Sequence, residues 1–245
     1  MSNQAYERIR NNLNQVEMRI LRACAQANRD RHDITLVAVT KTRSLGEILA
    51  AHGCGLRHFG ENRVEEMEAK LPHLKQALAQ DLPLWHMIGH IQSRKASRVV
   101  ETADVVHSLD SLKLAKHLDR FAAEAGRILP VLIEVNVSGE AAKYGLNAST
   151  PDETARFIEQ AREMENLRNL DIQGLMTMAP LVDDPEESRP TFRQLARLRD
   201  QLREELPDSQ WEELSMGMTN DFEVAIQEGA SMVRIGRAIF GPRQE

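Results

Sequence analysis

The 245-residue sequence contains little cysteine and no long apolar segment. Cys24 and Cys54 are its only cysteines and have no Cys or His at ligand spacing. Neither a disulfide framework nor a zinc site is therefore indicated, and we expect two buried thiols. The longest apolar run, Ile128–Ile133, contains a proline and is much shorter than the ~18 residues of a membrane helix. The N-terminus has no apolar core behind its basic residues, so we expect no secretory signal and a cytoplasmic location.

An excess of basic residues is also missing. The chain has 31 Lys and Arg against 37 Asp and Glu, and its net charge of −6 disfavours binding to a nucleic-acid backbone. Hydrophobic residues make up 42% and charged residues 28%, which is typical of a globular protein and excludes disordered and collagenous chains. The length suits one large α/β barrel, so we predict a single domain over residues 1–245.

The first 30 residues predict a leading helix. Ile9, Leu13, Val16, Ile20 and Leu21 recur at spacings of three and four among polar residues, which places them on one apolar stripe. We expect this helix to cover one end of the barrel.

Short β-branched runs alternate with helical patterns along the rest of the chain. We predict strands at Ile34–Val39, Leu56–Phe59, Leu84–Ile88, Val105–Leu109, Val131–Val137, Ile172–Met178, Glu213–Met216 and Met232–Ile235. We predict helices at Ser44–His52, Arg63–Leu78, Ser111–Ala125, Asp152–Glu165, Ser188–Glu205 and Asn220–Glu228. Strand and helix in repeated alternation imply parallel pairing.

Eight strands of this kind favour the α/β class and a single closed (β/α)8 TIM barrel. An open doubly wound sheet would more often carry a Gly-rich first turn, and the sequence has no G-x-G-x-x-G. The loop Ala179–Pro190 is predicted to be a solvated rim. Its acidic side chains are Asp183, Asp184, Glu186 and Glu187.

Lys41 follows the first predicted strand, at the end where catalytic groups of such barrels project into one mouth. A lysine in a partly apolar mouth has its charged form disfavoured, and its neutral amine can attack a carbonyl to form an imine. A solvent-exposed lysine without a chemical role is the alternative interpretation.

The segment Ser215–Asp221 leads from the seventh strand into a helix. Gly217 permits a tight turn there. We expect Thr219 or Asn220 to cap the helix, since Asn220 and Glu223 have the spacing of a capping box. Such a helix start attracts anions, although a serine and a glycine at this place are also ordinary turn residues.

The eighth strand ends in Arg234-Ile-Gly-Arg237. Gly236 permits close approach of an oxyanion to the backbone, and arginine supplies charged donors. The loops after strands seven and eight are the usual phosphate site of this barrel. Together with Lys41 they indicate a phosphorylated carbonyl ligand. A sugar phosphate in a Schiff-base aldolase and pyridoxal 5′-phosphate both have that form, and spacing does not choose between them.

Several motifs, in order and covering nearly the whole chain, resemble those of the pyridoxal-phosphate-binding homeostasis proteins, the YggS or PLPBP family. They are Leu36-Val-Ala-Val-Thr-Lys41, His58-Phe-Gly-Glu-Asn62, Trp85-His-Met-Ile-Gly-His-Ile-Gln-Ser-Arg-Lys95, Gly174-Leu-Met-Thr-Met178, Leu214-Ser-Met-Gly-Met-Thr219 and Val233-Arg-Ile-Gly-Arg-Ala-Ile-Phe-Gly241. The resemblance implies a barrel like the N-terminal domain of alanine racemase, with pyridoxal phosphate held as a Schiff base on Lys41.

The same resemblance implies roles for other residues. Ser215, Gly236 and neighbouring backbone, that of Gly217 included, would hold the phosphate. Arg234 would face the pyridine nitrogen, where a permanent cation disfavours protonation and weakens the ring as an electron sink. Two further residues would line the pocket, Asn62 and His86. Arg237 stands where many relatives have a small hydroxyl residue, and its guanidinium would either replace that bond to the phosphate or point outward.

For the other histidines we expect structural roles. His58 and His107 alternate with apolar neighbours on strands, which predicts histidines satisfied inside the barrel. His86 and His90 lack the H-E-x-x-H pattern, and we expect no metal site.

The resemblance implies a carrier that buffers pyridoxal phosphate and supplies it to dependent apoenzymes. We expect a monomer without membrane or nucleic-acid partners. A weak amino-acid racemase is the alternative. Racemisation needs a second base, which in alanine racemase is a tyrosine of an additional domain. Here Tyr144, in the loop after the fifth strand, is the tyrosine that could reach the mouth.

Overall fold

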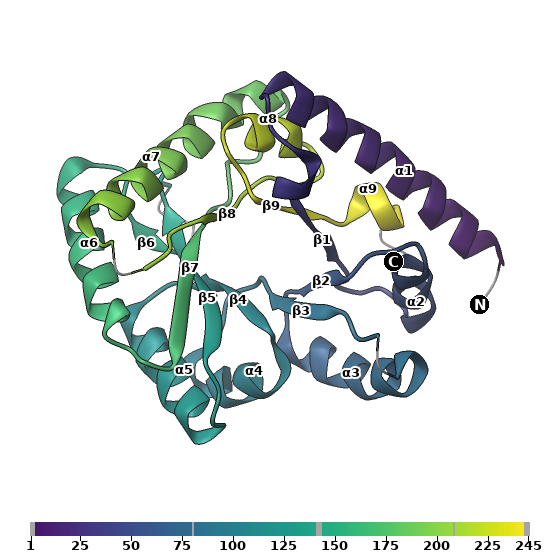
Figure 1. The fold of residues 1–245 in the computed structure, drawn as a ribbon, viewed down its shortest axis with the longest axis horizontal. Helices are drawn as coiled ribbons and strands as arrows, with labels where there is room; N and C mark the ends of the chain where they lie inside the picture. Colours follow the sequence, from purple (N-terminus) through teal and green to yellow (C-terminus); the bar gives the residue numbers. More distant parts are fainter. Residues whose placement is uncertain (1–2, 80, 141–143, 208, 243–245) are drawn as a thin grey trace.

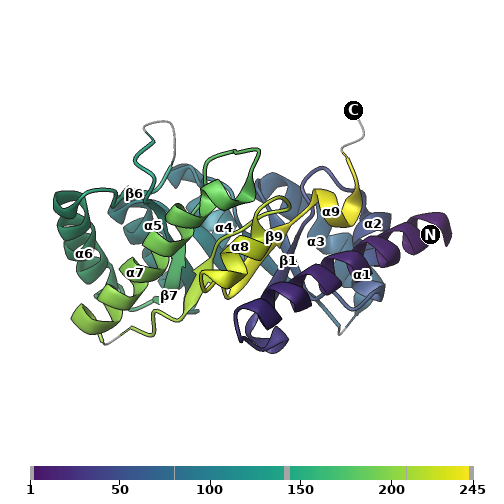
Figure 2. The same ribbon diagram turned by 90° about the horizontal axis from the view of Figure 1, so that it is seen from above.

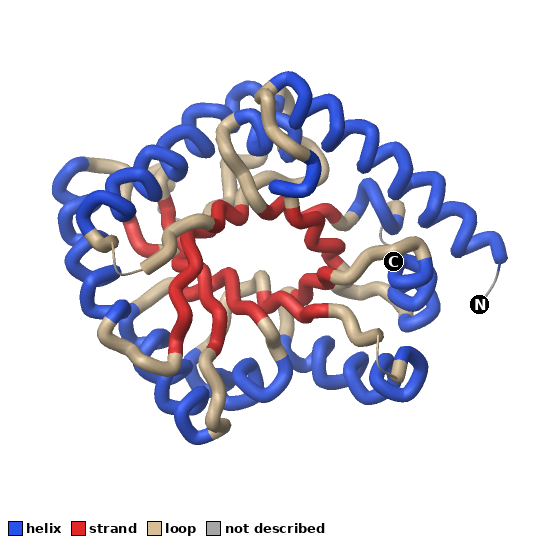
Figure 3. The backbone as a smooth tube through the Cα atoms, viewed as in Figure 1, coloured by secondary structure: helices blue, strands red, loops and turns tan. Residues whose placement is uncertain are grey.

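A ring of eight parallel strands forms the centre of the protein (Figure 3). The computed structural model describes residues 3–79, 81–140, 144–207 and 209–242. The ring consists of β1 (Thr35–Val39), β2 (His58–Glu61), β3 (Leu84–Met87), β4 (Val105–Leu109), β5 (Leu129–Asn136), β7 (Leu170–Met176), β8 (Glu213–Ser215) and β9 (Met232–Ile235). The order β4-β3-β2-β1-β9-β8-β7-β5 closes through the pairing of β4 with β5. The predicted (β/α)8 barrel is therefore confirmed.

A short additional strand, β6 (Leu146–Asn147), pairs with the C-terminal end of β5. Helices surround the ring (Figure 1). They are α1 (Asn3–Gln26), α2 (Leu45–Gly53), α3 (Val64–Leu78), α4 (Ala96–Thr102), α5 (Leu112–Glu124), α6 (Pro151–Glu165), α7 (Arg189–Glu205), α8 (Phe222–Gln227) and α9 (Arg237–Phe240). Single 3-10 turns occur at Arg31–Asp33, Ser93–Lys95 and Pro185–Ser188.

Local sequence signals set several helix starts. Ser44 and Glu47 form a reciprocal capping box at α2, and Thr150 and Glu153 form another at α6. Side chains thereby satisfy backbone N–H groups that have no partner within the helix. The sequence predicts the starts of α2, α3, α5, α6 and α7 to within one residue.

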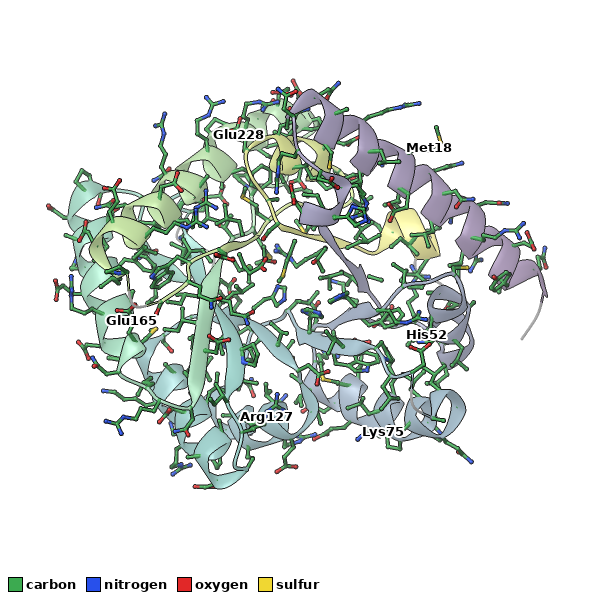
Figure 4. All side chains as sticks on the ribbon, in the orientation of Figure 1. Met18, His52, Lys75, Arg127, Glu165 and Glu228 are labelled. Atoms are coloured by element: carbon green, nitrogen blue, oxygen red, sulfur yellow. The ribbon has the colours of Figure 1, made fainter. Side chains whose placement is uncertain are left out.

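The leading helix α1 lies in the outer ring of helices, where it contacts α2, α8 and α9, and not across an end of the barrel (Figure 1). The expectation of an end cap was wrong because α8 and α9 are too short to cover the strands beside them. Ile9, Leu13, Val16 and Ile20 are buried as predicted, whereas Leu21 is 51% exposed. The outer face of α1 includes Met18, which points away from the barrel (Figure 4).

Apolar side chains fill the layer between strands and helices, but the inside of the ring is largely polar. A small apolar cluster of Leu132, Met176 and Met232 lies inside it. Several buried polar groups share that interior, namely His86, His107, Glu134, Ser215 and Arg234. Branched aliphatic layers are usual at this place in such barrels, so the polar filling marks a functional interior.

The two cysteines and the acidic loop after β7 follow the sequence predictions in most respects. Cys24 is buried as expected, whereas Cys54 is only partly buried, and both thiols are free. The acidic side chains of the loop after β7 are exposed, which confirms the solvated rim. Within the described ranges, none of the helices is long and apolar enough to cross a membrane.

Candidate functional site

The C-terminal ends of the strands meet at one mouth, on the side where β6, the loop after β7 and α9 rise in Figure 2. Lys41 follows β1, Asn62 follows β2, Gly217 follows β8 and Gly236 follows β9. These strands are neighbours in the order β2-β1-β9-β8. The amine and the two candidate phosphate loops, far apart in the sequence, thus come from one side of the mouth, as predicted.

The backbone just before Lys41 is held from outside the barrel. The ammonium of Lys70 on α3 donates to the carbonyl oxygen of Thr40 at 2.9 Å, and the Thr40 hydroxyl donates to Glu61 Oε1 at 2.7 Å. Lys70 also lies 2.5 Å from Glu61 Oε1. Glu61 is fully buried, and its other oxygen has no hydrogen-bond partner among the described residues. Burial raises the pKa of Glu61, while the charge of Lys70 opposes that rise.

The backbone just after Lys41 is held as well. Thr42 adopts a φ of 63°, which is unfavourable for a β-branched residue, and its N–H donates to Glu66 Oε2 at 2.8 Å. Glu66 and Lys70 are one helical turn apart on α3. One helix therefore fixes both sides of the turn that presents Lys41. Sequence reasoning missed Glu61, Glu66 and Lys70, although the spacing of the last two was a visible signal.

Arg234 is buried at the floor of the mouth, with 4% of its surface exposed. Its Nη1 donates to Ser215 Oγ at 2.6 Å, and its Nη2 donates to the carbonyl oxygen of Thr177 at 2.9 Å. Burial lowers the pKa of Arg234 to about 10, and the carboxylates of Glu134 and Asp221 oppose that shift. The guanidinium therefore stays charged at neutral pH and is held in a fixed orientation.

Ser215 and His86 lie below the mouth. Ser215 is fully buried, and its hydroxyl contacts His107 Nδ1 at 2.8 Å as well as Arg234. His86 is 1% exposed and contacts His58 and His107, so it lies in the barrel interior. The structure thus gives both residues partners other than those that the resemblance implied. His107 is a satisfied barrel histidine, as predicted, since both of its ring nitrogens have partners, whereas His58 is partly exposed and contacts His86 through one ring nitrogen.

The loop after β8 requires a glycine. Gly217 has a φ of 93°, and a Cβ there would lie 2.6 Å from the Cβ of Ala225. Asp221 closes the turn by accepting from the N–H of Met218 at 2.6 Å. Since α8 begins at Phe222, after Asp221, the expected capping by Thr219 or Asn220 was wrong.

The loop after β9 brings two chain segments close together. A Cβ on Gly236 would lie 3.3 Å from both the Cβ and the carbonyl oxygen of Val39 at the end of β1. Arg237 is exposed and begins α9. Its side chain lines a small hollow of about 70 Å³ with residues of the loops after β7 and β8, including Leu181 and Met218. Arg237 thus lies at the surface of the predicted phosphate end.

The other side of the mouth contains a cavity of about 390 Å³. Asn62, Glu134 and Tyr144 line it, together with His90 and residues of the loops around them. Glu134 is 3% exposed, and burial, with help from the charge of Asp110, raises its pKa to about 7. A larger groove of about 530 Å³ between α6 and α7 contains none of the predicted site residues.

Tyr144 is fixed at the rim of this cavity. Its ring stacks on that of His90, with centroids 4.2 Å apart, and His90 Nδ1 lies 2.8 Å from Asp110 Oδ2. Tyr144 is nevertheless 55% exposed. In the part of the chain that the structure describes, no cluster of His, Cys, Asp and Glu could hold a metal ion.

Comparison with known proteins agrees with this geometry. The profile of the alanine racemase N-terminal domain family matches residues 7–244. The chain belongs to this family. Within it, a relative from Aquifex aeolicus is 40% identical over 95% of this chain and 97% of its own length, and one from Haemophilus influenzae is 39% identical over 96% of both chains. Both are named pyridoxal phosphate homeostasis protein, so the resemblance that the motifs indicate is confirmed.

Solved structures of other proteins have the same fold. A protein of Bifidobacterium adolescentis has a TM-score of 0.90 at 36% identity, over 98% of this chain and 97% of its own. PipY of Synechococcus elongatus PCC7942, with PLP bound, has a TM-score of 0.78 at 34% identity, over 91% of this chain and 100% of its own. Alanine racemase of Clostridium difficile 630, at 14% identity and a TM-score of 0.71, covers 98% of this chain and 58% of its own, and shares the fold alone.

Proposed function

We propose that this protein binds pyridoxal 5′-phosphate through Lys41 and takes part in its homeostasis as a buffer and supplier of the cofactor. The observation that carries the proposal is the convergence of Lys41, the Gly217 and Gly236 loops and the buried Arg234 at the ends of three neighbouring strands, β1, β9 and β8. Relatives named pyridoxal phosphate homeostasis protein, and a relative solved with PLP bound, support it.

The residues present fit this group. At Gly217 and Gly236, where a Cβ would meet the neighbouring chain, the backbone can approach an oxyanion closely. Because the Ser215 hydroxyl is engaged in the interior, we assign the hydroxyl contact with the phosphate to the half-buried Thr219. Arg237 stands at the same rim as an additional cation.

The aldehyde end and the ring would have their own partners. When bound, the cofactor supplies an aldehyde that bonds reversibly to a primary amine. The clamped turn between Thr40 and Thr42 presents the amine of Lys41 for this bond. Arg234 would donate to the ring nitrogen, and its charge keeps a proton off that nitrogen. This arrangement therefore disfavours strong carbanion chemistry and favours reversible binding of the cofactor.

The test is the absorption spectrum of the purified protein after addition of pyridoxal phosphate, followed by borohydride reduction and peptide mapping. We expect a visible band and a reduced adduct on Lys41. The absence of a band, or an adduct on another lysine alone, would remove the proposal. A Schiff-base aldolase would instead show no visible band and would form the adduct with a sugar phosphate.

A weak amino-acid racemase is the second candidate, and the position of Tyr144 and Glu134 at one cavity favours it. Both groups can exchange protons, and the pKa of about 7 suits Glu134 to that task. The discriminating measurement is exchange at Cα of amino acids in deuterated water. A rate above that of free cofactor, lost in Tyr144→Phe or Glu134→Gln, would favour the enzyme.

We further propose that the protein is a cytoplasmic monomer that passes the cofactor to apoenzymes. Light scattering tests the monomer, and reactivation of an apoenzyme by the loaded protein, faster than by an equal amount of free cofactor, tests the transfer.

A further inference from the structure

A continuous series of hydrogen bonds crosses the interior of the barrel and ends at Arg234. From Arg234 Nη1 it passes to Ser215 Oγ (2.6 Å) and on to His107 Nδ1 (2.8 Å). From His107 Nε2 it continues to His86 Nδ1 (2.8 Å), and from His86 Nε2 to His58 Nδ1 (3.0 Å). We name His58, His86, His107 and Ser215 the histidine chain. It joins β2, β3 and β4 to β8 on the other side of the ring.

Donor and acceptor rules give the histidine chain one direction. A guanidinium can only donate, so the Ser215 hydroxyl accepts from Arg234 and is free to donate its own proton to His107 Nδ1. His107 must then carry its proton on Nε2 and donate to His86, which donates in the same way to His58. In the reverse direction, the Ser215 proton would have no acceptor among the contacts of the described residues, at the cost of an unsatisfied buried donor.

The histidine chain is neutral. Burial lowers the pKa of His86 to about 3 and holds that of His107 well below its ordinary value, with neighbouring histidines adding to both shifts. Burial also lowers the pKa of the partly exposed His58. The fixed charge of the series is therefore that of Arg234. A neutral polar chain across a barrel core is costly unless every group is hydrogen-bonded, and this arrangement satisfies each group except the outer nitrogen of His58.

We propose that the histidine chain positions Arg234: its aligned dipoles place an acceptor against the guanidinium, hold it at the floor of the mouth and couple it to His58 at the start of β2. The carbonyl oxygen of Thr177 accepts from the second Nη of Arg234. The N–H groups of Arg234 that are not used in these two hydrogen bonds among the described residues are the ones we assign to a ligand. The histidine chain residues are positioning residues and do not touch the cofactor. This role rests on the proposed function for the identity of the ligand.

The first test uses the ligand-free wild-type protein with ¹⁵N-labelled histidine. Nitrogen NMR distinguishes the two neutral tautomers and the cation. We expect His58, His86 and His107 to be neutral at pH 7, each with its proton on Nε2. A proton on Nδ1 of any of the three, or a charged ring, would overturn the assigned direction.

The second test breaks the histidine chain at two places. Ser215→Ala removes the group next to Arg234. His86→Leu interrupts the middle, while His86→Gln keeps a donor and an acceptor. The exposed His73 on α3 offers a control in His73→Leu. For Ser215→Ala and His86→Leu we expect roughly tenfold weaker binding of pyridoxal phosphate, because a hydrogen-bonded charge is less well held, with the adduct still on Lys41. His86→Gln should recover part of the loss.

If the histidine chain couples Arg234 to His58, ligand binding at Arg234 must also affect His58, which packing alone does not require. Addition of pyridoxal phosphate should shift the ring nitrogen resonances of His58 in the wild type and not in Ser215→Ala. The proposal is refuted if Ser215→Ala binds pyridoxal phosphate with unchanged affinity and if His58 of the wild type shows no shift on addition of pyridoxal phosphate. This holds even if His86→Leu fails to fold. If the wild type forms no adduct at Lys41, the proposed function fails, whereas the tautomer measurement still decides the direction of the histidine chain.

Discussion

At the scale of single residues, Lys41 differs from an ordinary surface lysine because other side chains fix its backbone. Thr40 and Thr42 are each held by groups of β2 or α3, so the amine is presented at a defined place without contributing to the packed layers below. We call these hydrogen bonds to Thr40 and Thr42 the clamp. The clamp and the amine of Lys41 therefore have separate roles. Loss of the amine should remove the chemistry and leave the fold.

Lys41→Ala tests this separation. We expect the visible band with pyridoxal phosphate to disappear, because among the described residues no other lysine directly follows a strand beside the phosphate loops. The thermal unfolding midpoint of the ligand-free protein should stay close to that of the wild type, since strand-end side chains add little to the core. Absorption and circular dichroism measure the two properties, and their joint loss would contradict the prediction.

Glu134 gives a prediction for pH. Its pKa in the fold is raised to about 7 from 4.5, so the unfolded chain loses the proton first as pH rises. The stabilisation by the protonated form is present below about pH 4.5 and is lost as pH rises through about 7. Relative to Glu134→Gln, the wild type should lose on the order of 3 kcal/mol across that window. Urea unfolding of both proteins measures it, and parallel pH curves would refute it.

At the scale of elements, the order of strands and helices could be predicted from the sequence, because periodicity reports which faces are buried. The path of α1 could not, since it depends on how short α8 and α9 are. Likewise, the motif positions of Lys41, Asn62 and Gly236 predicted the mouth. The interior partners of Ser215 and the clamp on Lys41 join distant strands and helices, and only the closed barrel shows them.

The clamp links α3 to the start of the site and can be tested at Lys70. Lys70→Met would leave the fully buried carboxyl of Glu61 without its cation, which costs roughly 3–5 kcal/mol of unfolding free energy. The loss relative to the wild type should shrink in mildly acidic buffer, as Glu61 takes up a proton. Lys75→Met, on the outer side of the same helix, is the matched control (Figure 4). Equal losses in both variants would show that Lys70 acts as a surface charge.

The turn after β8 depends on the backbone conformation of Gly217. Gly217→Ala puts a methyl group 2.6 Å from the Cβ of Ala225 in a backbone conformation that alanine rarely adopts. We expect a loss of about 1–3 kcal/mol in unfolding free energy and weaker binding of pyridoxal phosphate. Gly229, with a φ of 102° but no Cβ contact closer than 3.9 Å, separates the two causes, since Gly229→Ala should cost stability and leave affinity unchanged. Equal affinity losses would place the effect outside the phosphate loop.

At the scale of the whole molecule, the proposed ligand would join parts of the barrel that are far apart in the chain. Lys41 lies near the beginning of the sequence, and the phosphate loops lie near its end, on the neighbouring strands β1, β9 and β8. These strands also pair early segments with late ones. Ligand binding should therefore directly increase the stability of the part of the barrel formed by β1, β9 and β8.

Pyridoxal phosphate should stabilise the barrel as a whole by mass action. At free ligand 100 times above its dissociation constant, the unfolding free energy should rise by about 2.7 kcal/mol, and the thermal midpoint should increase with ligand concentration. Lys41→Ala should retain only the part due to the phosphate loops and Arg234, so its midpoint should rise less at every concentration. Hydrogen exchange should show the added protection first in β1, β8 and β9. Protection confined to α6 and α7, beside the larger groove, would place the ligand there and contradict a site at the mouth.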